Sequence, residues 1–391
     1  MITHFNSLPN ESGNSRFFYI ADLLEKKGIV PEILTTSFSH IEKSQRNLKT
    51  KLNYNINYCY EPNYQKNISF KRFHSHFIFA KNVKKYLKNR KKPDVVYCSI
   101  PSLDIGGVVA KYCKKNNVKF IIDIQDLWPE AFQMVFNVPL INNIIFYPFV
   151  KKADYIYSSA DEIIAVSETY AKRALRVNKN CKEINSIFLG TELKTFDKLR
   201  ESNKIIRKDN EIWIGYIGTL GHSYDITCVI DAIENLKEKG YENLKFIIMG
   251  DGPLKTKFEN YAESKDINYN FTGRLKYAEM VGLLCSCDIA VNPISKGAAQ
   301  SIINKVGDYA AAGLSVINSQ ECEEYRYLIE KYNCGINCKN NDFVDISEKL
   351  ELLIKNKNLR KKTGENSRKL AEEKFDREET YNKILKILLK D

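Results

Sequence analysis

The feature that most constrains this chain is a repeated alternation of short apolar runs with longer amphipathic segments. The runs within 93–99, 118–126, 211–218 and 244–250 have the length of strands and are rich in β-branched and aromatic residues. Segments with a helical period, such as 223–240, separate these runs. Strands that alternate with helices predict parallel sheets covered on both faces. We therefore expect an α/β fold of two doubly wound domains that face each other across a cleft.

The domain boundary is expected in the polar stretch 195–210, which lacks apolar periodicity. A length of 391 residues also favours two domains over one. We predict a first domain over 1–200 and a second over 201–370. The tail from Asp345 is almost wholly amphipathic, so it is expected to be helical.

Several classes of protein are disfavoured by the sequence. No apolar run reaches the roughly 18 residues that cross a bilayer, and the first residues lack the pattern of a secretory signal. The ten cysteines form no CxxC pair or Cys/His cluster, so we expect reduced, mostly buried thiols and no metal site. We therefore expect a cytosolic globular protein.

The net charge of +12 is distributed unevenly. Residues 1–200 carry 31 Lys and Arg against 18 Asp and Glu, whereas residues 201–391 carry 29 against 30. Residues 66–92 alone hold ten basic side chains and no acidic one. The first half is therefore expected either to meet an anionic partner or to carry a solvated basic face.

Ligands of doubly wound sheets bind beyond the carboxyl ends of the strands, close to helix N-termini. Gly215, Gly218 and Gly221 surround the first loop of the second half, where backbone N–H groups could approach a phosphate. Their spacing is not the G-x-G-x-x-G fingerprint, which disfavours a nicotinamide enzyme. Tight turns explain such glycines equally well.

The segment 292–313 is more specific, because a polar loop leads from a buried strand into a helix. Gln300 and Ser301 are expected at the start of that helix, where a diphosphate could accept backbone N–H bonds. Asp308, eight residues beyond Gln300, could accept two ribose hydroxyls. The alternative is a surface helix on which Lys305 and Asp308 form an i, i+3 ion pair.

Five motifs in order strongly resemble the donor-binding half of bacterial family 4 glycosyltransferases, which have the GT-B fold. These motifs are GYIGTLG, MGDGPLKTKF, NFTGRLKYAEM, CDIAVNPI and NKVGDYAAAGLSVI. In the first half, SFSH, DIQDLWPEAF and ADEIIAVSETYAKRAL are similar to the same family, so the resemblance covers essentially the whole chain. The nearest branch builds capsule, O-antigen and other lipid-linked surface glycans. The resemblance implies Rossmann-like domains and a C-terminal helix, 371–391, that returns to the first domain.

The chain departs from the family's pattern at three places. The family's Glu-x7-Glu is Gln300-x7-Asp308 here, and its His-Asp pair is Gln125-Asp126. Thr219 and His222 occupy the region of its usual basic residue, so phosphate charge could instead meet Arg274 or Lys305.

When the family's site residues are transferred by position, the resemblance implies that Asp126, Gln300 and Lys305 are catalytic. It also implies a larger set of residues that bind the donor. The donor-binding set is Gly218, Thr219, Gly221, Asp251, Arg274, Leu275, Gln300, Ser301, Ile302, Asn304, Lys305 and Asp308. On the acceptor side we expect Gly13, Asn14 and Arg16, although a solvated Arg16 fits its position equally well.

The resemblance implies a retaining, metal-independent hexosyltransferase or N-acetylhexosaminyltransferase without a cofactor. It would move a sugar from a nucleotide-sugar donor, UDP-linked or else GDP-linked, to a glycan or polyprenyl-diphosphate-linked acceptor. One alternative is a UDP-sugar epimerase of the same architecture, which would need more carboxylates and histidines in the first half than we find. A nucleic-acid binder is disfavoured because no recognition motif accompanies the basic segment.

The basic segment 66–92 links the charge to the acceptor. Its apolar residues Phe70, Phe73, Phe77, Ala80, Val83 and Leu87 recur at helical steps, and His74 and His76 are expected at its surface. The apolar stripe could face the sheet, with the lysines in water. Lysines on the remaining faces would attract anionic lipid, at about 1 kcal/mol per nearby Lys or Arg. We expect peripheral association with the inner face of the cytoplasmic membrane through this segment.

Overall fold

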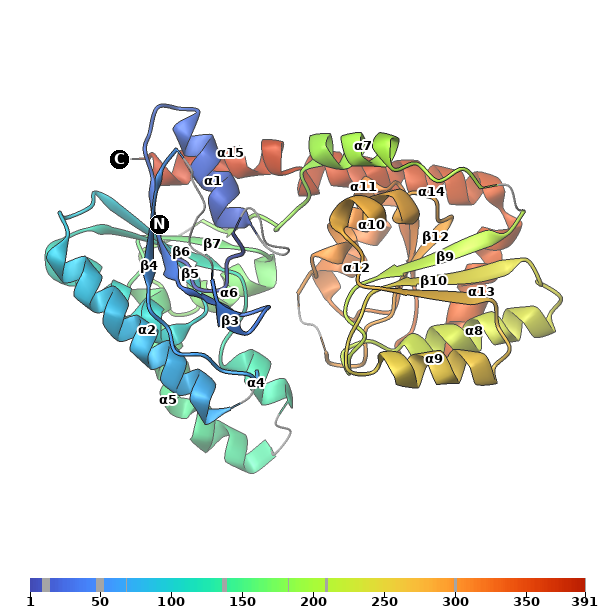
Figure 1. Cartoon of the computed structure of the whole chain (residues 1–391), viewed down its shortest axis with the longest axis horizontal. Helices are drawn as coiled ribbons and strands as arrows, with labels where there is room; N and C mark the ends of the chain where they lie inside the picture. Colours follow the sequence, from blue (N-terminus) through green and yellow to red (C-terminus); the bar gives the residue numbers. More distant parts are fainter. Residues whose placement is uncertain are drawn as a thin grey trace. The chain divides into compact units, whose positions relative to one another are not determined.

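The structure is a computed structural model. It describes residues 1–8, 15–46, 53–67, 69–135, 139–181, 183–207, 210–298 and 301–390. Its packing divides the chain into two compact units (Figure 1). Unit 1 contains Met1–Ile187 and Tyr381–Asp391, and unit 2 contains Phe188–Thr380. The chain thus changes unit after Ile187 and again after Thr380, whereas the sequence analysis divides it after residues 200 and 370.

Unit 1 is built on a parallel sheet whose middle is completed by one residue of the N-terminal segment. Strands β5-β6-β7-β8 form one part of the sheet and β1-β4 the other. Ile2 pairs with both Leu34 and Cys98 and so lies between β1 and β5. The strands are β1 (Glu32–Thr36), β4 (Asn55–Cys59), β5 (Val95–Ile100), β6 (Lys119–Ile124), β7 (Glu162–Ala165) and β8 (Asn185–Ser186), with a short hairpin of β2 (Phe38–Ser39) and β3 (Ser44–Gln45).

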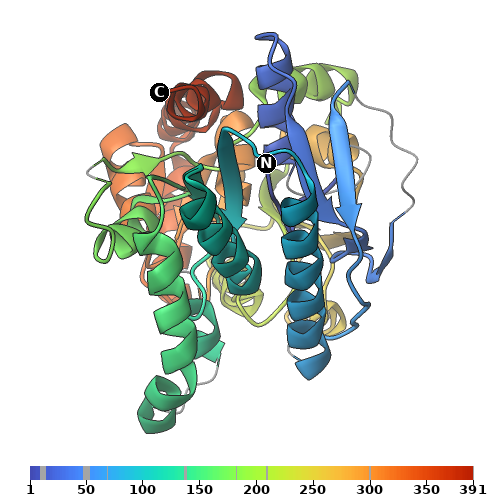
Figure 2. The same ribbon diagram turned by 90° about the vertical axis from the view of Figure 1, so that its left-hand side faces the viewer.

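Helices α2, α3 and α5 lie side by side in unit 1 (Figure 2). The buried side chains of α1 and α15 form an apolar cluster with β5, β6 and β7 that includes Phe17, Tyr97, Ile121, Ile164 and Ile384. The helices are α1 (Arg16–Glu25), α2 (Phe70–Asn89), α3 (Leu103–Asn116), α4 (Glu130–Val135), α5 (Pro139–Ser158), α6 (Glu168–Leu175) and the unit 1 end of α15 (Arg377–Leu388).

The predicted stripe of α2 is right in its second half and wrong in its first two turns. Ala80, Val83 and Leu87 are buried, but Phe70 and Phe77 are 94% and 59% exposed. At this end the buried positions are instead polar, because Arg72, Ser75 and His76 contact aromatic rings and a carboxylate of the unit. No helix that the structure describes is both long and apolar enough to span a bilayer.

Unit 2 has a six-stranded parallel sheet with the order β11-β10-β9-β12-β13-β14, so the winding direction changes between β9 and β12. These two strands pair only at Ile214 with Ile289 and at Gly215 with Ala290. Beyond that point the hydroxyl of Tyr309 bridges them, since it accepts from Ile217 N at 3.1 Å and donates to Val291 O at 3.1 Å. The strands are β9 (Ile212–Ile217), β10 (Leu244–Met249), β11 (Tyr269–Gly273), β12 (Ile289–Asn292), β13 (Ser315–Asn318) and β14 (Gly335–Asn337).

Two expectations about the elements of unit 2 are wrong. The expected polar boundary contains α7, whose Leu193 and Phe196 are buried in an apolar cluster. The helix expected from Ser301 begins only at Lys305. The helices are α7 (Leu193–Ser202), α8 (Ile226–Glu238), α9 (Lys255–Ser264), α10 (Tyr277–Leu284), α11 (Lys305–Ala311), α12 (Glu323–Tyr332), α13 (Phe343–Lys355), α14 (Lys357–Leu370) and η1 (Ala371–Phe375).

The expected state of the cysteines is confirmed. All ten are free thiols, of which nine are buried and Cys285 is half-buried. Burial raises the pKa of Cys59 to about 11, which keeps that thiol protonated and inert.

Candidate functional site

The loops after β9 and β10 pack backbone against backbone at the carboxyl edge of the unit 2 sheet. A Cβ on Gly250 would lie 1.8 Å from the carbonyl oxygen of Gly218, so this contact admits only glycine. Gly218 itself has φ +134, a conformation that side chains disfavour. The winding direction changes beside these loops, which is where ligands of doubly wound sheets bind.

Lys305 approaches the first of these loops from helix α11. Its ammonium nitrogen lies 4.0 Å from the ring centroids of both Tyr216 and Tyr224. A Cβ on Gly218 would be only 3.1 Å from this nitrogen. Nζ is buried and hydrogen-bonds to no residue that the structure describes, so the alternative of a surface pair with Asp308 is wrong. Burial lowers the pKa of Lys305 well below its ordinary value, because no bonded anion offsets the desolvation.

Asp308 lies one turn further along α11 and is half-buried. Tyr277 and Thr191 both donate hydrogen bonds to its Oδ1, at 2.9 and 3.1 Å. Burial raises the pKa of this carboxyl group, while the two hydroxyls oppose that change. Among the described residues both bonds end on the same oxygen, so Oδ2 can still accept from a ligand hydroxyl.

A buried ladder of amides holds the segment that precedes α11. β12, β13 and β14 each end on an asparagine, and these three residues are paired in register. Asn318 accepts from Asn292 Nδ2 at 2.8 Å and donates to Asn337 Oδ1 at 2.9 Å. Gln320 continues the network, because its Nε2 donates to the carbonyl of Ser301 at 2.7 Å. Sequence reasoning missed this network, although three strands ending on asparagine were a visible signal.

The other expected donor residues lie on the loops that follow β9, β10 and β11 or in the segment that precedes α11. Thr219, Asp251, Arg274 and Asn304 are exposed, and Asn304 is the N-cap of α11. The carboxylate of Asp251 accepts from Gly252 N at 2.8 Å. Gly221, Ser301 and Ile302 are buried, and Leu275 packs partly buried against a core cluster. Gln300 lies outside the described residues.

Residues 197–370 match the family described as glycosyl transferases group 1. The chain contains a group 1 glycosyltransferase domain. The matched region includes the loops after β9 and β10, the amide ladder and both Lys305 and Asp308.

Two relatives align with the chain over part of their length. An uncharacterized glycosyltransferase of Methanocaldococcus jannaschii is 27% identical over 237 residues, which cover 59% of each protein. A Campylobacter jejuni enzyme is 24% identical over 225 residues, 56% of this chain and 57% of the relative. It is named GalNAc-α-(1→4)-GalNAc-α-(1→3)-diNAcBac-PP-undecaprenol α-1,4-N-acetyl-D-galactosaminyltransferase. The chain thus spans less than two thirds of the length of these relatives.

Solved structures share the fold over nearly the whole chain, which confirms the expected GT-B class. Sucrose-phosphate synthase of Thermosynechococcus elongatus has a TM-score of 0.76 at 13% identity, covering 99% of this chain and 98% of that one. HepE of Anabaena in complex with UDP has a TM-score of 0.69 at 12% identity, with the same coverage. A protein assigned as UDP-N-acetylglucosamine 2-epimerase, from Listeria monocytogenes, has a TM-score of 0.60 at 12% identity and coverages of 98% and 94%. The fold alone therefore does not separate transferase from epimerase.

The residues expected on the acceptor side belong to unit 1. Arg16 neither faces a cleft nor lies in solvent, so both expectations for it are wrong. It is fully buried and forms a bidentate ion pair with Asp123, with Nε 2.8 Å from Oδ2 and Nη2 3.2 Å from Oδ1. Its Nη1 also donates to Ile187 O at 3.0 Å. Gly13 and Asn14 lie outside the described residues.

Asp126 follows β6 at the carboxyl edge of the unit 1 sheet. Its carboxylate accepts from Trp128 Nε1 at 3.1 Å and from the hydroxyl of Tyr170 at 3.3 Å. Burial raises the pKa of Asp126, and these hydrogen bonds oppose the shift. Trp128 is buried, as expected for a packing residue.

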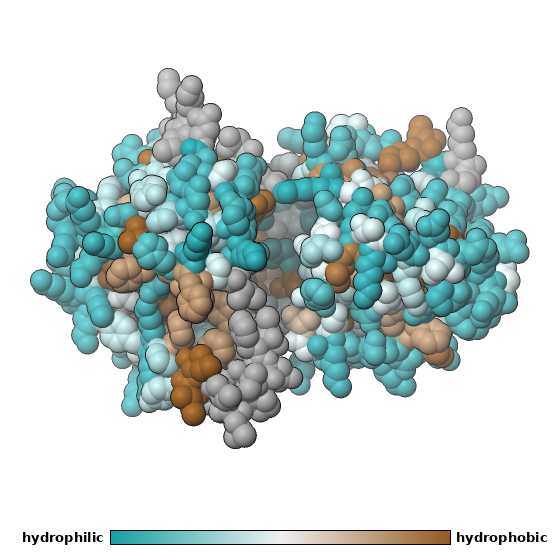
Figure 3. Space-filling view, turned by 60° about the horizontal axis from the view of Figure 1, so that its bottom comes forward, coloured by the Kyte–Doolittle hydropathy of each residue, from teal (hydrophilic) through white to brown (hydrophobic). Residues whose placement is uncertain are grey.

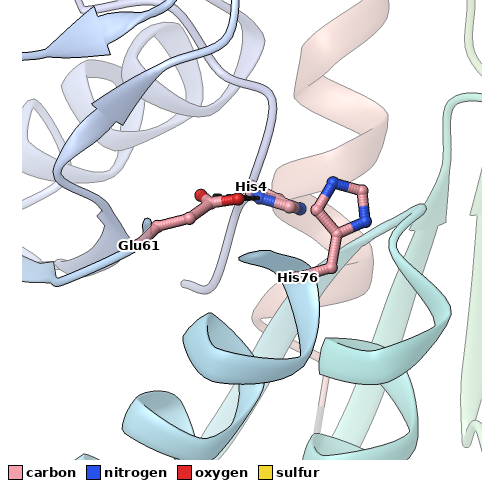
Figure 4. Close-up of side chains that lie close together, drawn as sticks. All are labelled: His4, Glu61 and His76. Atoms are coloured by element: carbon pink, nitrogen blue, oxygen red, sulfur yellow. Dashed lines mark hydrogen bonds and ion pairs between the residues drawn. The ribbon is translucent and has the colours of Figure 1, made fainter. Parts of the chain in front are cut away.

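A buried His-Glu-His cluster lies beside this edge, contrary to the expected exposure of His76. His4 lies between Glu61 and His76, and its Nε2 hydrogen-bonds both oxygens of Glu61 at 3.0 and 2.9 Å (Figure 4). Potential ligand atoms of the three residues lie within 4.8 Å of one another, close enough for a metal ion. However, Ser75 also bonds Glu61 Oε1 at 2.8 Å, and Arg72 Nε lies 3.4 Å from His76 Nε2. These bonds and the neighbouring guanidinium favour a hydrogen-bonded network over a cation site.

A basic groove of about 1060 Å³ lies along α2, α3 and α5. Among its described lining residues, Asp104 alone is acidic, and it forms an ion pair with Lys152. The basic lining residues are Lys81, Lys84, Lys88, Arg90, Lys92, Lys111, Lys115, Lys151 and Lys152. Sequence reasoning found the α2 residues but not those that the fold adds from α3 and α5.

Proposed function

We propose that this protein transfers a sugar from a nucleotide-sugar donor to a hydroxyl of a lipid-linked glycan during surface polysaccharide synthesis. The observation that carries the proposal is the buried Lys305 ammonium beside Gly218, within a group 1 glycosyltransferase domain. A buried cation without an anionic partner is costly, and a donor diphosphate would supply that partner.

The donor chemistry follows from α11 and the adjoining loops. The diphosphate would accept from Lys305 and from backbone N–H groups of the loop at Gly218, while Asp308 would accept ribose hydroxyls. Negative charge builds on the diphosphate as the glycosidic bond to it breaks, so a fixed cation stabilises the transition state without a metal ion. Retention of configuration, a hexosyl or N-acetylhexosaminyl group and UDP are parts of this proposal. Similarity to a UDP-bound neighbour and to an N-acetylgalactosaminyltransferase supports them.

The acceptor is proposed to be a glycan on a polyprenyl diphosphate, as in the name of the Campylobacter relative. Such an acceptor would lie at the cytoplasmic face of a membrane. The basic groove would contact anionic headgroups there, each nearby Lys or Arg contributing about 1 kcal/mol. Figure 3 shows apolar side chains gathered near the lower edge of unit 1. Phe70 of α2 and Ile144 of α5 are 94% and 77% exposed. The rings of Phe73 in α2 and Phe149 in α5 also lie near each other, with their centroids 6.2 Å apart.

Donor binding is tested by thermal unfolding of the full chain with UDP, GDP and UDP-sugars. A ligand at 100 times its dissociation constant stabilises the folded state by about 2.7 kcal/mol. We expect UDP and one UDP-sugar to raise the melting temperature, and we expect this rise to shrink in Asp308→Ala and Lys305→Met. Wild-type responses in both variants would remove these residues from the donor site.

The reaction itself is tested by incubating the protein with radiolabelled UDP-sugars and a bacterial lipid extract. Label that enters the organic phase supports transfer. An epimerised nucleotide sugar without transfer would establish the epimerase alternative instead. If neither product forms and a separate assay shows that the protein binds nucleic acid, the protein is a nucleic-acid binder.

Membrane association is tested by co-sedimentation with vesicles of graded anionic content. We expect binding to rise with anionic lipid, to fall with salt, and to weaken at least tenfold when Lys81, Lys84, Lys85 and Lys88 are changed to Gln. A matched control changes the exposed lysines 331, 361, 362 and 339 of unit 2 to Gln. The proposal is contradicted if vesicle binding does not depend on the content of anionic lipid. It is also contradicted if the α2 variant and the unit 2 control weaken binding equally.

A further inference from the structure

Arg72 is a buried guanidinium surrounded by aromatic rings at the carboxyl edge of the unit 1 sheet. It is 9% exposed, and its Cζ lies 5.0, 5.5 and 5.9 Å from the ring centroids of Trp128, Phe5 and Tyr64. Nη1 donates to the carbonyl of Asn67 at 2.6 Å. Aromatic faces attract a cation but do not neutralise it, so the positive charge of Arg72 is retained.

Lys43 adds a second cation beside Tyr64. Its Nζ lies 4.9 Å from the Tyr64 ring centroid and donates to Asn67 Oδ1 at 2.6 Å. Lys43 is only half-buried, so this side of the cluster is open to solvent. Its φ of +55 is unusual for a residue with a side chain, and such conformations are common at functional sites. Burial and the nearby Arg72 both lower the pKa of Lys43, as expected for two cations that lack a shared anion.

The nearby carboxylates are already used elsewhere. Glu61 accepts hydrogen bonds from His4 and Ser75, and Asp126 accepts from Trp128 and Tyr170. Neither Arg72 nor Lys43 forms an ion pair with any carboxylate in the described part of the chain. His40, 3.4 Å from Lys43 Nζ, is held neutral because burial and both cations lower its pKa to about 3. The cluster thus concentrates positive charge that no described ion pair neutralises, although Glu61 and Asp126 lie close enough to attract Arg72.

Four residues of this cluster lie in segments that follow a strand or pairing residue at its carboxyl end, and Arg72 lies in the first turn of α2. Phe5 follows the pairing residue Ile2, Lys43 follows β1 and β2, Tyr64 follows β4, and Trp128 follows β6. Ligands of doubly wound sheets bind at this edge. We propose that Arg72 and Lys43 form an anion subsite that holds an oxyanion of the acceptor, either its diphosphate or the carboxylate of an acidic sugar. This inference rests on the proposed transfer to a glycan acceptor, and it assigns the part of that acceptor which unit 1 recognises.

Anion binding at the subsite can be followed by the fluorescence of Trp128, which lies beside Arg72. The chain has only one other tryptophan, Trp213. Trp213 lies in the core of unit 2, so Trp213→Phe leaves Trp128, beside Arg72, as the single emitter. Lys305→Met in the same background removes anion binding at the donor loops. The full-length double variant is titrated with inorganic pyrophosphate and with potassium glucuronate, against KCl at equal ionic strength, while Trp128 emission is recorded.

We expect a saturable change in Trp128 emission with at least one of the two anions and none with KCl. Arg72→Gln and Lys43→Gln should each weaken the apparent affinity at least tenfold, whereas Lys114→Gln, which removes an exposed charge of the same unit, should not. A response to pyrophosphate alone assigns the subsite to the lipid diphosphate, and a response to glucuronate alone assigns it to an acidic sugar. If circular dichroism shows that Arg72→Gln does not fold, the anion titration of Lys43→Gln alone tests the subsite.

The inference is overturned if neither anion gives a saturable response, or if the response is unchanged in Lys43→Gln and in a folded Arg72→Gln. The titration measures no turnover, so it is independent of the transfer assay. A normal titration without transfer to any glycan would retain the subsite and reject the proposed function.

Discussion

At the scale of single residues, donor binding at the proposed site depends most on the protonation of Lys305. Burial lowers its pKa in the ligand-free protein, whereas a bound diphosphate would stabilise the charged form and raise the pKa again. Between the free and bound pKa values, binding therefore takes up a proton, and UDP affinity falls as the pH rises through that interval.

This prediction is checked by isothermal titration of UDP in two buffers of different ionisation enthalpy. We expect an uptake of up to about one proton per UDP, and no uptake together with at least tenfold weaker binding in Lys305→Met, equivalent to about 1.4 kcal/mol. Equal apparent enthalpies in both buffers across the pH range would contradict it.

Arg16 allows a prediction about stability, because its ion pair with Asp123 is fully buried. Removing one member of a buried pair leaves the other charge without compensation and costs about 3–5 kcal/mol. We expect Arg16→Met to lower the free energy of unfolding by that amount in urea titrations. Arg16→Met combined with Asp123→Leu should recover part of the loss, because no charge is then left buried. A loss below about 1 kcal/mol in the single variant would show that the pair contributes little.

Residue types in the candidate site could be found from the sequence, but their environments could not. Lys305 and Asp308 were found by their position in a motif. The burial of Arg16 and His76 was missed, because a charged residue in a first helical turn or on a basic helix is normally solvated. Asp123, 107 residues away in the chain, compensates the buried charge of Arg16, and His76 is buried against the rings of His4 and Trp128.

At the scale of elements, apolar periodicity predicted β5, β6, β9, β10 and the helix α8, and it failed where few apolar side chains mark the packing. The segment 193–202 is polar overall, yet two buried side chains suffice to hold α7 against unit 2. The turn before α11 was assigned to the helix because its composition is helix-compatible. Instead, Gln320 donates to the backbone carbonyl of Ser301 while its own Oε1 accepts from Asn292 Nδ2.

The amide ladder provides the prediction at this scale. Asn318→Leu keeps the volume of the side chain but leaves Asn292 and Asn337 without their partner, at about 1–3 kcal/mol for each unpaired group. We expect a lower melting temperature of unit 2 and weaker UDP binding, since the ladder fixes the backbone before α11. The control Asn243→Leu changes an exposed amide at the other end of the sheet. Unchanged UDP affinity in a destabilised Asn318→Leu would restrict the ladder to a structural role.

At the scale of the whole molecule, the chain crosses between its units twice, and the second crossing is the helix α15. Its last turns belong to unit 1, where Ile384 is fully buried in the same cluster as Phe17 and Ile121. The sequence showed an amphipathic tail, but its apolar face alone did not specify which unit it covers. That choice depends on the complementary surface of α1, which only the fold creates.

Ile384→Ala should therefore destabilise unit 1 although residue 384 follows the whole of unit 2 in the chain. Replacing a buried Ile by Ala costs about 2–5 kcal/mol, because apolar contacts are lost and a cavity remains. In scanning calorimetry, UDP should raise only the transition of unit 2, which identifies the other transition as that of unit 1. We expect Ile384→Ala to lower the unit 1 transition and leave the other in place, while Lys383→Ala, at an exposed position of the same helix, moves neither. If both transitions fell together, α15 would couple the two units into one cooperative structure rather than act as a terminal helix of unit 1.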